Sequence, residues 1–257
     1  MNKENLKIPL AIILIGFLIA IIVYFSSTVS QKISPELITE VPAEYTFTKI
    51  APVTDKDHII GNPTADVIFV EYSDTECPAC KIFYGIMNKI MAEFAKDGKV
   101  AWVYRHLPIH SKSKAEAIAT ECAATLGGEK TFWSYLSRIY DVTPGNDGLN
   151  LETLPVMAIN LGIKKVDFEK CMRENSVSVK VENDLKDALL ATNNIPETPN
   201  TVAIFKNPLT QTSVEDLQIE FAGYQMDIGI SPDKKMIQFG GSMPFTTIKL
   251  IIEKALN

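Results

Sequence analysis

The cysteine pair in Cys77-Pro78-Ala79-Cys80 constrains the fold most, because it lies between a predicted strand and a predicted helix. Residues 67–72 form the β-branched and aromatic run of a buried strand, and residues 83–94 repeat apolar side chains with a helical period. Cys77 therefore falls at a helix N-terminus, where unpaired backbone N–H groups and the helix dipole favour a thiolate. Pro78 suits the first helical position, because its missing N–H would have no partner there.

A dithiol in this context is typical of redox chemistry. Half of a zinc site and a plain structural disulfide are the two alternatives. Zinc normally takes a second close pair of ligands, whereas Cys122 and Cys171 are isolated in the sequence. The motif therefore favours a redox-active disulfide, and we expect no metal and no other cofactor.

An uncharged apolar run extends from Ile8 to Phe25. Its 18 residues would rise by about 1.5 Å each and span roughly 27 Å, close to the hydrocarbon core of a bilayer. A cleaved signal peptide is the competing interpretation, but its apolar region would be shorter and a small-residue cleavage site would follow it. We therefore expect residues 1–25 to form an uncleaved membrane anchor and residues 26–45 to form a linker.

The charges around this run predict its orientation. Lys3 and Lys7 precede it and acidic residues dominate the segment after it, which places the N-terminus in the cytoplasm and the rest of the chain outside. Cysteines in such a compartment are oxidised or redox-active. The chain carries a formal net charge of −6 although its anchor is basic, so the remainder would repel nucleic-acid phosphates and no nucleic-acid binding is expected.

Residues 46–257 are long enough for one domain with a sizeable core. Residues 67–73, 78–96 and 99–105 predict a strand, a helix and a strand, which implies a right-handed parallel crossover. A helical block at about 111–193 follows. The expected elements after it are strands at 201–205, 219–221 and 236–239, and a final helix over 245–256. This order predicts an α/β domain with a helical insertion.

Several segments together resemble the DsbA-like branch of the thioredoxin superfamily, the extracytoplasmic thiol:disulfide oxidoreductases. They are residues 57–63, the active-site segment 71–80, residues 104–108 with His110, residues 121–124, 132–133 and 168–172, and the pair Thr198-Pro199. The resemblance covers roughly residues 55–205 and the last helix. It implies a thioredoxin-like fold with a helical insertion, here preceded by one N-terminal transmembrane helix.

The resemblance implies dithiol–disulfide exchange, with Cys77 as the nucleophile and Cys80 as the shielded partner. It also implies that the Thr198-Pro199 bond is cis and lies beside Cys77, so that the Thr198 backbone can pair with an extended substrate. The expected partners are unfolded or reduced exported proteins and a membrane quinone-linked thiol oxidase of the DsbB or VKOR type. We expect the protein to be a membrane-anchored monomer.

Redox tuning is expected from Glu76, Pro78 and Ala79. Ala79 occupies the position at which the strongest oxidants of the family carry histidine, and Glu76 adds a negative charge that opposes the nucleophilic thiolate. These features predict an oxidant milder than the histidine-bearing members. Two other departures are Glu197, where glycine often precedes the Thr-Pro pair, and a longer segment at 206–243.

Cys122 and Cys171 have three possible states: a second redox pair, two free buried thiols or a structural disulfide. Both lie on apolar faces of predicted helices in an oxidising compartment, which favours the structural disulfide. The three histidines are expected to be structural rather than catalytic. They are His58, His106 and His110. A metal site is an alternative with weak support, because no His/Cys spacing matches a known ligand pattern.

Three functions are compatible with these patterns. The leading one is an oxidase that introduces disulfides into exported proteins. A disulfide isomerase or reductase is the second, although isomerases of this superfamily usually carry a dimerisation domain for which the residues between Phe25 and His58 are too few. The third is a non-catalytic adaptor or holdase in which the cysteine pair is only a bridge.

Overall fold

The computed structural model describes residues 50–226 and 228–257. The expected anchor, residues 1–25, and the expected linker, residues 26–45, lie outside the described residues. Among the helices of the described residues, none is both long and apolar enough to cross a membrane.

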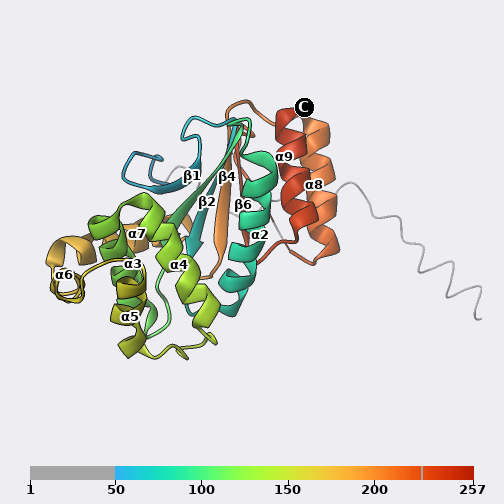
Figure 1. The fold of residues 1–257 in the computed structure, drawn as a ribbon. Helices are drawn as coiled ribbons and strands as arrows, with labels where there is room; N and C mark the ends of the chain where they lie inside the picture. The colour runs from blue at the N-terminus through green and yellow to red at the C-terminus, as the bar shows by residue number, and fades with distance from the viewer. Residues whose placement is uncertain (1–49, 227) are drawn as a thin grey trace, which may run out of the picture. The chain divides into compact units, whose positions relative to one another are not determined.

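The described strands form one six-stranded sheet in the order β1-β3-β2-β4-β6-β5 (Figure 1). β2 and β3 are parallel and α2 connects them, which confirms the predicted crossover, whereas the other neighbours are antiparallel. The strands are β1 (His58–Gly61), β2 (Val67–Ser73), β3 (Val100–His106), β4 (Asn200–Phe205), β5 (Gly229–Ile230) and β6 (Met236–Gly240).

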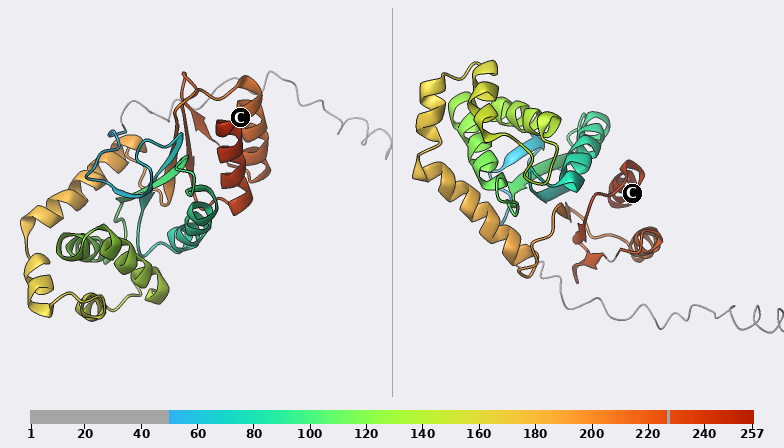
Figure 2. Two further views of the ribbon diagram at one scale, coloured as in Figure 1. Left: turned by 45° about the horizontal axis from the view of Figure 1, so that its top comes forward. Right: turned by 90° about the horizontal axis from the view of Figure 1, so that it is seen from below.

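The helices fall into two groups along the chain (Figures 1 and 2). The helices that belong to the α/β core are α2 (Pro78–Phe94), α8 (Gln211–Gly223) and α9 (Phe245–Leu256). Those between β3 and β4 are α3 (Ser113–Gly127), α4 (Glu129–Val142), α5 (Leu154–Asn160), α6 (Lys165–Cys171) and α7 (Asn175–Ala191), with a 3-10 turn at Leu151–Thr153. This second group confirms the helical insertion.

The alternation of side chains along β2 places two different cores on the two faces of the sheet. Val67 and Phe69 pack on one face in the cluster that contains buried residues of α2, α8 and α9. Val70 and Tyr72 pack on the opposite face with buried residues of α7. The next residue that shares the α2 face is Glu71, so a carboxylic acid is placed beneath the helix that begins with the cysteine motif.

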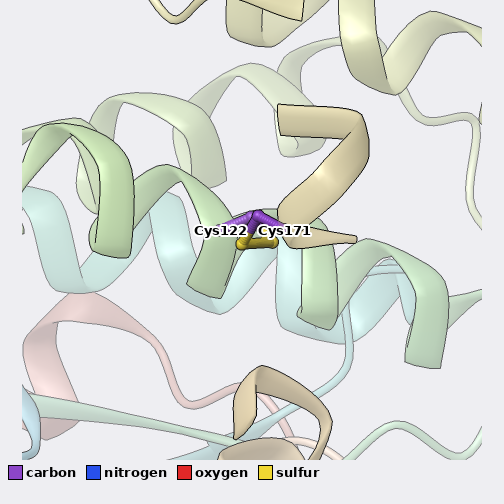
Figure 3. Close-up of a disulfide and its surroundings, with 2 residues drawn as sticks. All are labelled: Cys122 and Cys171. Carbon is purple, nitrogen blue, oxygen red and sulfur yellow. A yellow bond between two sulfur atoms is a disulfide. The ribbon is translucent and has the colours of Figure 1, made fainter. Parts of the chain in front are cut away.

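The insertion has a third core of its own, and a disulfide crosses it. Cys122 of α3 and Cys171 of α6 are bonded, with their Cα atoms 5.8 Å apart and a sequence separation of 49 (Figure 3). Both sulfur-bearing side chains are buried among apolar residues of the insertion. The disulfide therefore fastens the short helix α6 to the longer helix α3.

The strand predicted at 219–221 is wrong, because this segment is part of α8. Ile219 and Phe221 were interpreted as alternating strand residues, but Ile219 is 72% exposed and Phe221 is buried. The buried positions are Val214, Leu217 and Phe221, which follow a helical period against α9. Thr210 caps this helix by accepting a hydrogen bond from the Ser213 amide.

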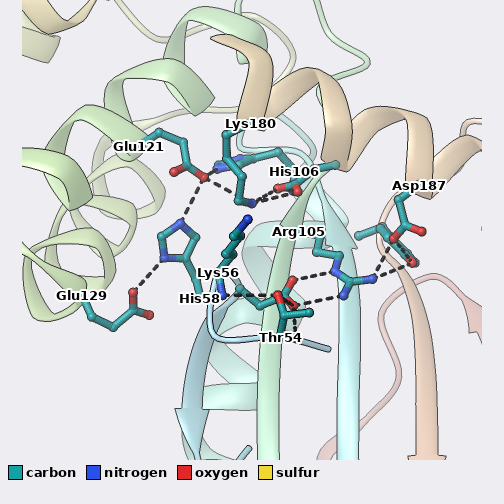
Figure 4. Close-up of polar contacts among 12 residues, drawn as sticks. Thr54, Lys56, His58, Arg105, His106, Glu121, Glu129, Lys180 and Asp187 are labelled. Atoms are coloured by element: carbon teal, nitrogen blue, oxygen red, sulfur yellow. Dashed lines mark hydrogen bonds and ion pairs between the residues drawn. The ribbon is translucent and has the colours of Figure 1, made fainter. Parts of the chain in front are cut away.

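A buried ion network joins the segment before β1 to β3 and α7 (Figure 4). The Arg105 guanidinium donates to Asp57 at 2.8 Å and to Asp187 at 2.7 Å. Asp187 also accepts from the Tyr72 hydroxyl and from the Ala51 amide. Because these groups pair with one another, their charges are tolerated inside the protein.

A second network joins β1 to the insertion through His58 (Figure 4). Its Nε2 lies 3.0 Å from Glu121 of α3, and its Nδ1 lies 2.8 Å from Glu129 of α4. The ring also stacks on Phe132, with 3.4 Å between ring centroids. His58 thus holds the sheet against two helices of the insertion.

Candidate redox site

The cysteine motif begins α2, as its sequence predicts. Cys77 is the N-cap residue with an extended backbone, and Pro78 occupies the first turn. The backbone N–H groups of Ala79 and Cys80 interact with the Cys77 sulfur. The orphan amides of the helix terminus therefore point at the atom on which negative charge would develop.

The two thiols of the motif have very different environments. Cys77 is 9% exposed, whereas Cys80 is fully buried. The hydrogen bond from the Cys80 thiol is the largest of the effects that lower the pKa of Cys77 to about 5, and burial opposes it. Burial and the Cys77 charge raise the pKa of the Cys80 thiol well above its usual range. The pair can hold one negative charge, and that charge resides on Cys77.

The loop before β4 lies next to the Cys77 thiol, although Thr198 is 121 positions from Cys77 in sequence. The Thr198-Pro199 peptide bond is cis. The Cys77 thiol donates to the Thr198 carbonyl oxygen at 3.3 Å. Two segments singled out by the sequence thus lie together, and the Thr198 carbonyl lies next to the Cys77 sulfur.

Asp74 is a residue of this site that sequence reasoning missed. Its buried carboxylate accepts hydrogen bonds from the amides of Glu76, Ile109 and His110 and from the Ser113 hydroxyl. Its own backbone N–H donates to the Cys80 sulfur at 3.4 Å. An aspartate after a strand and before a helix cap is a recognisable sequence signal for such a turn.

Glu71 is the second residue that was missed. It is fully buried, and its Oε2 accepts a hydrogen bond from the Trp102 indole at 2.9 Å. Burial raises the pKa of Glu71 to about 7, hydrogen bonds from Ser73 and Trp102 oppose the shift, and the charge of Cys77 adds to it. The alternation Val67, Phe69, Glu71 was the available signal, since it assigns the carboxyl group to the α2 face.

Glu76 is engaged with the loop that follows α4. Its carboxylate accepts from the Thr143 hydroxyl and from the Gly148 amide, each at 2.9 Å. Glu116 of α3 lies near it and is fully buried. Burial raises the pKa of Glu116 to about 8, a hydrogen bond with Thr75 opposes the shift, and the adjacent Glu76 adds to it.

The two other residues expected to tune the site lie at the start of α2. Ala79 is partly buried and packs against the core beneath the helix. Pro78 is exposed, and the backbone of Gly145 lies against its ring. Neither side chain brings a charge to Cys77.

One group of ligand-type side chains lies elsewhere in the described chain. His106, Glu121 and Asp184 offer atoms within 4.8 Å of one another. The Lys180 ammonium lies 2.7 Å from Asp184 and 3.7 Å from Glu121. A lysine therefore already supplies positive charge to these carboxylates, and the group has the composition of an ion-pair cluster.

The fold is matched by known proteins. A family profile described as Thioredoxin matches residues 53–218. Curated relatives include a Na(+)/H(+) antiporter NhaA 1 of Mycolicibacterium vanbaalenii, 31% identical over 139 residues, which are 52% of this chain and 21% of the antiporter. A Herminiimonas arsenicoxydans antiporter NhaA is 33% identical over 133 residues, 52% of this chain and 20% of the antiporter. The chain thus spans about a fifth of the length of these relatives.

Solved structures with the same fold include DsbA proteins. The chain is similar to Wolbachia pipientis alpha-DsbA1, with a TM-score of 0.59 and 18% identity over 79% of this chain and 92% of that one. Pseudomonas aeruginosa DsbA2 gives a TM-score of 0.54 and 22% identity over 78% and 95%. Oxidised BdbD of Bacillus subtilis gives a TM-score of 0.52 and 23% identity, and the match covers 63% of this chain and 85% of that one.

Proposed function

Because the chain belongs to the thioredoxin family, we propose that it is a thiol:disulfide oxidoreductase that oxidises cysteine pairs of exported proteins. One observation carries this proposal: the Cys77 thiol lies at a helix N-terminus beside the Thr198 carbonyl oxygen, whereas its partner thiol is fully buried. This arrangement lowers the pKa of Cys77 to about 5. A stabilised thiolate stabilises the reduced dithiol and makes the disulfide form a stronger oxidant.

The reaction follows from this asymmetry. In the oxidised protein, a substrate thiolate attacks the Cys77 sulfur, a mixed disulfide forms, and the Cys77–Cys80 bond breaks with its electron pair on Cys80, which takes up a proton. A second substrate thiolate then attacks the substrate sulfur of the mixed disulfide. It forms the substrate disulfide and releases Cys77 as a thiolate. Two electrons pass from the substrate dithiol to the protein.

The neighbouring groups have separate tasks in this scheme. Thr198 lies beside Cys77 and offers its backbone to an extended substrate chain, which accommodates many sequences because main-chain pairing ignores side-chain identity. The Glu71 carboxylate interacts electrostatically with both thiols and accepts protons near neutral pH. Glu76 and Asp74 hold the turn that carries Cys77.

The cellular setting completes the proposal. Residues 1–25 anchor the chain in the membrane with Lys3 and Lys7 on the cytoplasmic side, and the domain acts outside the cytoplasm. A quinone-linked thiol oxidase of the membrane returns the protein to its disulfide form. The protein acts as a monomer on unfolded or reduced exported proteins.

The reduction potential of the dithiol tests the direction of the reaction. We expect equilibration with a glutathione series to give a value well above the roughly −270 mV of a reducing thioredoxin and below the about −120 mV of the strongest oxidants. A potential near −270 mV would support the reductase instead. A pair that does not exchange with glutathione at all would support the non-catalytic adaptor.

A further inference from the structure

A pocket of about 340 Å³ lies between α4, the loop 143–150 and α5. Its apolar wall includes two side chains that are partly open to solvent, Val142 at 38% and Val156 at 54% exposure. The pocket is also lined by Arg138, Pro144, Leu149 and Met157. An apolar side chain of a bound ligand would cover both valines.

The wall of this pocket is continuous with the turn that carries Cys77. A Cβ atom at Gly145 would lie 3.1 Å from Cγ of Pro78, so the backbone after Pro144 packs directly on the start of α2. On the other side of the loop, the Gly148 amide donates to the Glu76 carboxylate. A chain bound at Cys77 would therefore pass close to the loop that lines the pocket.

The charge of the pocket comes from Arg138. This side chain is exposed, and within the described part of the chain it forms no salt bridge. An arginine on the rim of an apolar pocket matches a carboxylate that adjoins an apolar side chain. The pocket residues thus favour a ligand that has both an apolar group and a carboxylate. The cysteine motif alone sets no such preference.

We propose that this pocket binds the polypeptide substrate next to its reacting cysteine, with an apolar side chain against Val142 and Val156 and a carboxylate at Arg138. The inference rests on the proposed function, since it names a substrate class for the same exchange site. It makes the protein selective among reduced chains: a cysteine with an apolar and acidic neighbour reacts faster than the same cysteine with a basic neighbour.

Matched dithiol peptides test this selectivity. They contain leucine and either aspartate or lysine, placed two, three or four residues to either side of one cysteine. The second-order rate of reduction of the oxidised protein is measured for each peptide and divided by the rate of the same protein with dithiothreitol. At the best position, we expect the aspartate peptide to react on the order of threefold to fivefold faster, the range of a partly exposed ion pair.

Two substitutions and one control decide the outcome. Arg138→Glu should reverse the preference towards the lysine peptide, and Val156→Ser should slow both leucine peptides relative to dithiothreitol. Arg173→Glu makes the same charge change at an exposed position outside the pocket and should leave the preference as in the wild type. An unchanged preference in Arg138→Glu would overturn the pocket and leave the exchange reaction intact. Failure of the wild-type protein to react with dithiothreitol would instead overturn the proposed function.

Discussion

At the scale of single residues, the partner thiol has the largest effect on the pKa of Cys77. The hydrogen bond from Cys80 outweighs the other effects that lower the pKa of Cys77, which include contacts with Thr198 and with two backbone amides. Ala79 contributes only through its backbone amide, and Glu76 is not among these effects. In the proposed reaction, the buried Cys80 thiol is therefore a tuning group as well as the partner of Cys77.

The variant Cys80→Ala tests this dependence. Loss of the Cys80 thiol should raise the pKa of Cys77 from about 5 towards the ordinary value for cysteine, although the helix terminus remains. The rate of alkylation by iodoacetamide, measured against pH on reduced protein, gives the pKa directly. Cys77→Ala is the control, since its remaining buried thiol should alkylate slowly at neutral pH. Equal midpoints in the wild type and Cys80→Ala would contradict the assignment.

Glu71 makes a second prediction at this scale, through the pH dependence of stability. Its pKa is raised from 4.5 unfolded to about 7 folded, because burial disfavours the charge. The folded state therefore binds more protons between these values, and the contribution of Glu71 to the free energy of unfolding is lost as pH rises from 4.5 to 7. The loss is up to about 3 kcal/mol.

Glu71→Gln should abolish that loss while it keeps an acceptor for the Trp102 indole. Urea unfolding of both oxidised proteins at several pH values between 4.5 and 8 gives their free energies of unfolding. As the pH rises, the variant should become increasingly more stable relative to the wild type. Glu152→Gln removes an exposed carboxylate and should follow the wild type. Parallel curves for the wild type and Glu71→Gln would show that burial does not raise the pKa of Glu71 in the folded protein.

The sequence predicts only part of this site. The spacing of Cys77 and Cys80 and the Thr-Pro pair are short local patterns with known chemistry, so they were recognised. Glu71 and Asp74 acquire their roles from burial and from partners 31 to 39 positions away, such as Trp102 and Ser113. No local pattern reveals such partners, and only the face of the strand hints at Glu71.

At the scale of elements, the C-terminal part illustrates how a short apolar pattern misleads. Ile219 and Phe221 are two positions apart, which fits a strand, whereas Leu217 and Phe221 are four apart, which fits a helix. Leu217 and Phe221 are both buried against α9, which explains why the segment is a helix. The strand β5 has only two residues and is too short to give a sequence signal. The strands and helices of the active-site unit had longer periodic segments and were predicted within a few residues.

The Cys122–Cys171 disulfide makes the prediction that belongs to this scale. It closes a loop of 49 positions, so its removal in a Cys122→Ala, Cys171→Ala variant should cost about 4 kcal/mol in the chain-entropy model, less any native strain. Urea unfolding of the double variant and of the oxidised wild type measures the difference. The cost arises in the insertion, and exchange at Cys77 should persist.

Partial reduction separates the two cysteine pairs of the chain. Stable structural disulfides have potentials below about −300 mV, so a mild reductant should open Cys77–Cys80 first and leave α3 joined to α6. Mass mapping of alkylated peptides identifies the pair that opened. Simultaneous opening of both pairs would assign redox rather than structural character to Cys122 and Cys171.

At the scale of the whole described domain, two buried networks attach the insertion to the sheet. Arg105 pairs with Asp187 of α7, and His58 pairs with Glu121 and Glu129 of α3 and α4. Apolar packing alone would permit several orientations of such helices, whereas paired charges in the interior fit one arrangement. Because Asp74 and Glu76 also contact the insertion, the orientation of these helices affects the turn that holds Cys77.

His58 yields the prediction that tests this attachment. Although burial opposes the charged form, hydrogen bonds to Glu121 and Glu129 raise the pKa of His58 from 6.5 to about 9. The folded state therefore holds the extra proton between these values. The stabilisation is complete below pH 6.5 and is lost as pH rises to about 9, by up to about 3 kcal/mol.

The variant His58→Gln should remove this part of the pH dependence, because glutamine cannot carry the proton that bridges the two carboxylates. Urea unfolding is measured between pH 6 and 10 on the oxidised protein, so that the thiols of Cys77 and Cys80 do not titrate. Lys56→Gln also loses a positive charge close to β1, but its side chain is exposed, so its curve should keep the wild-type slope. If His58→Gln kept that slope as well, the histidine would be neutral in the folded protein, and the insertion would be held by packing and by the Arg105 network instead.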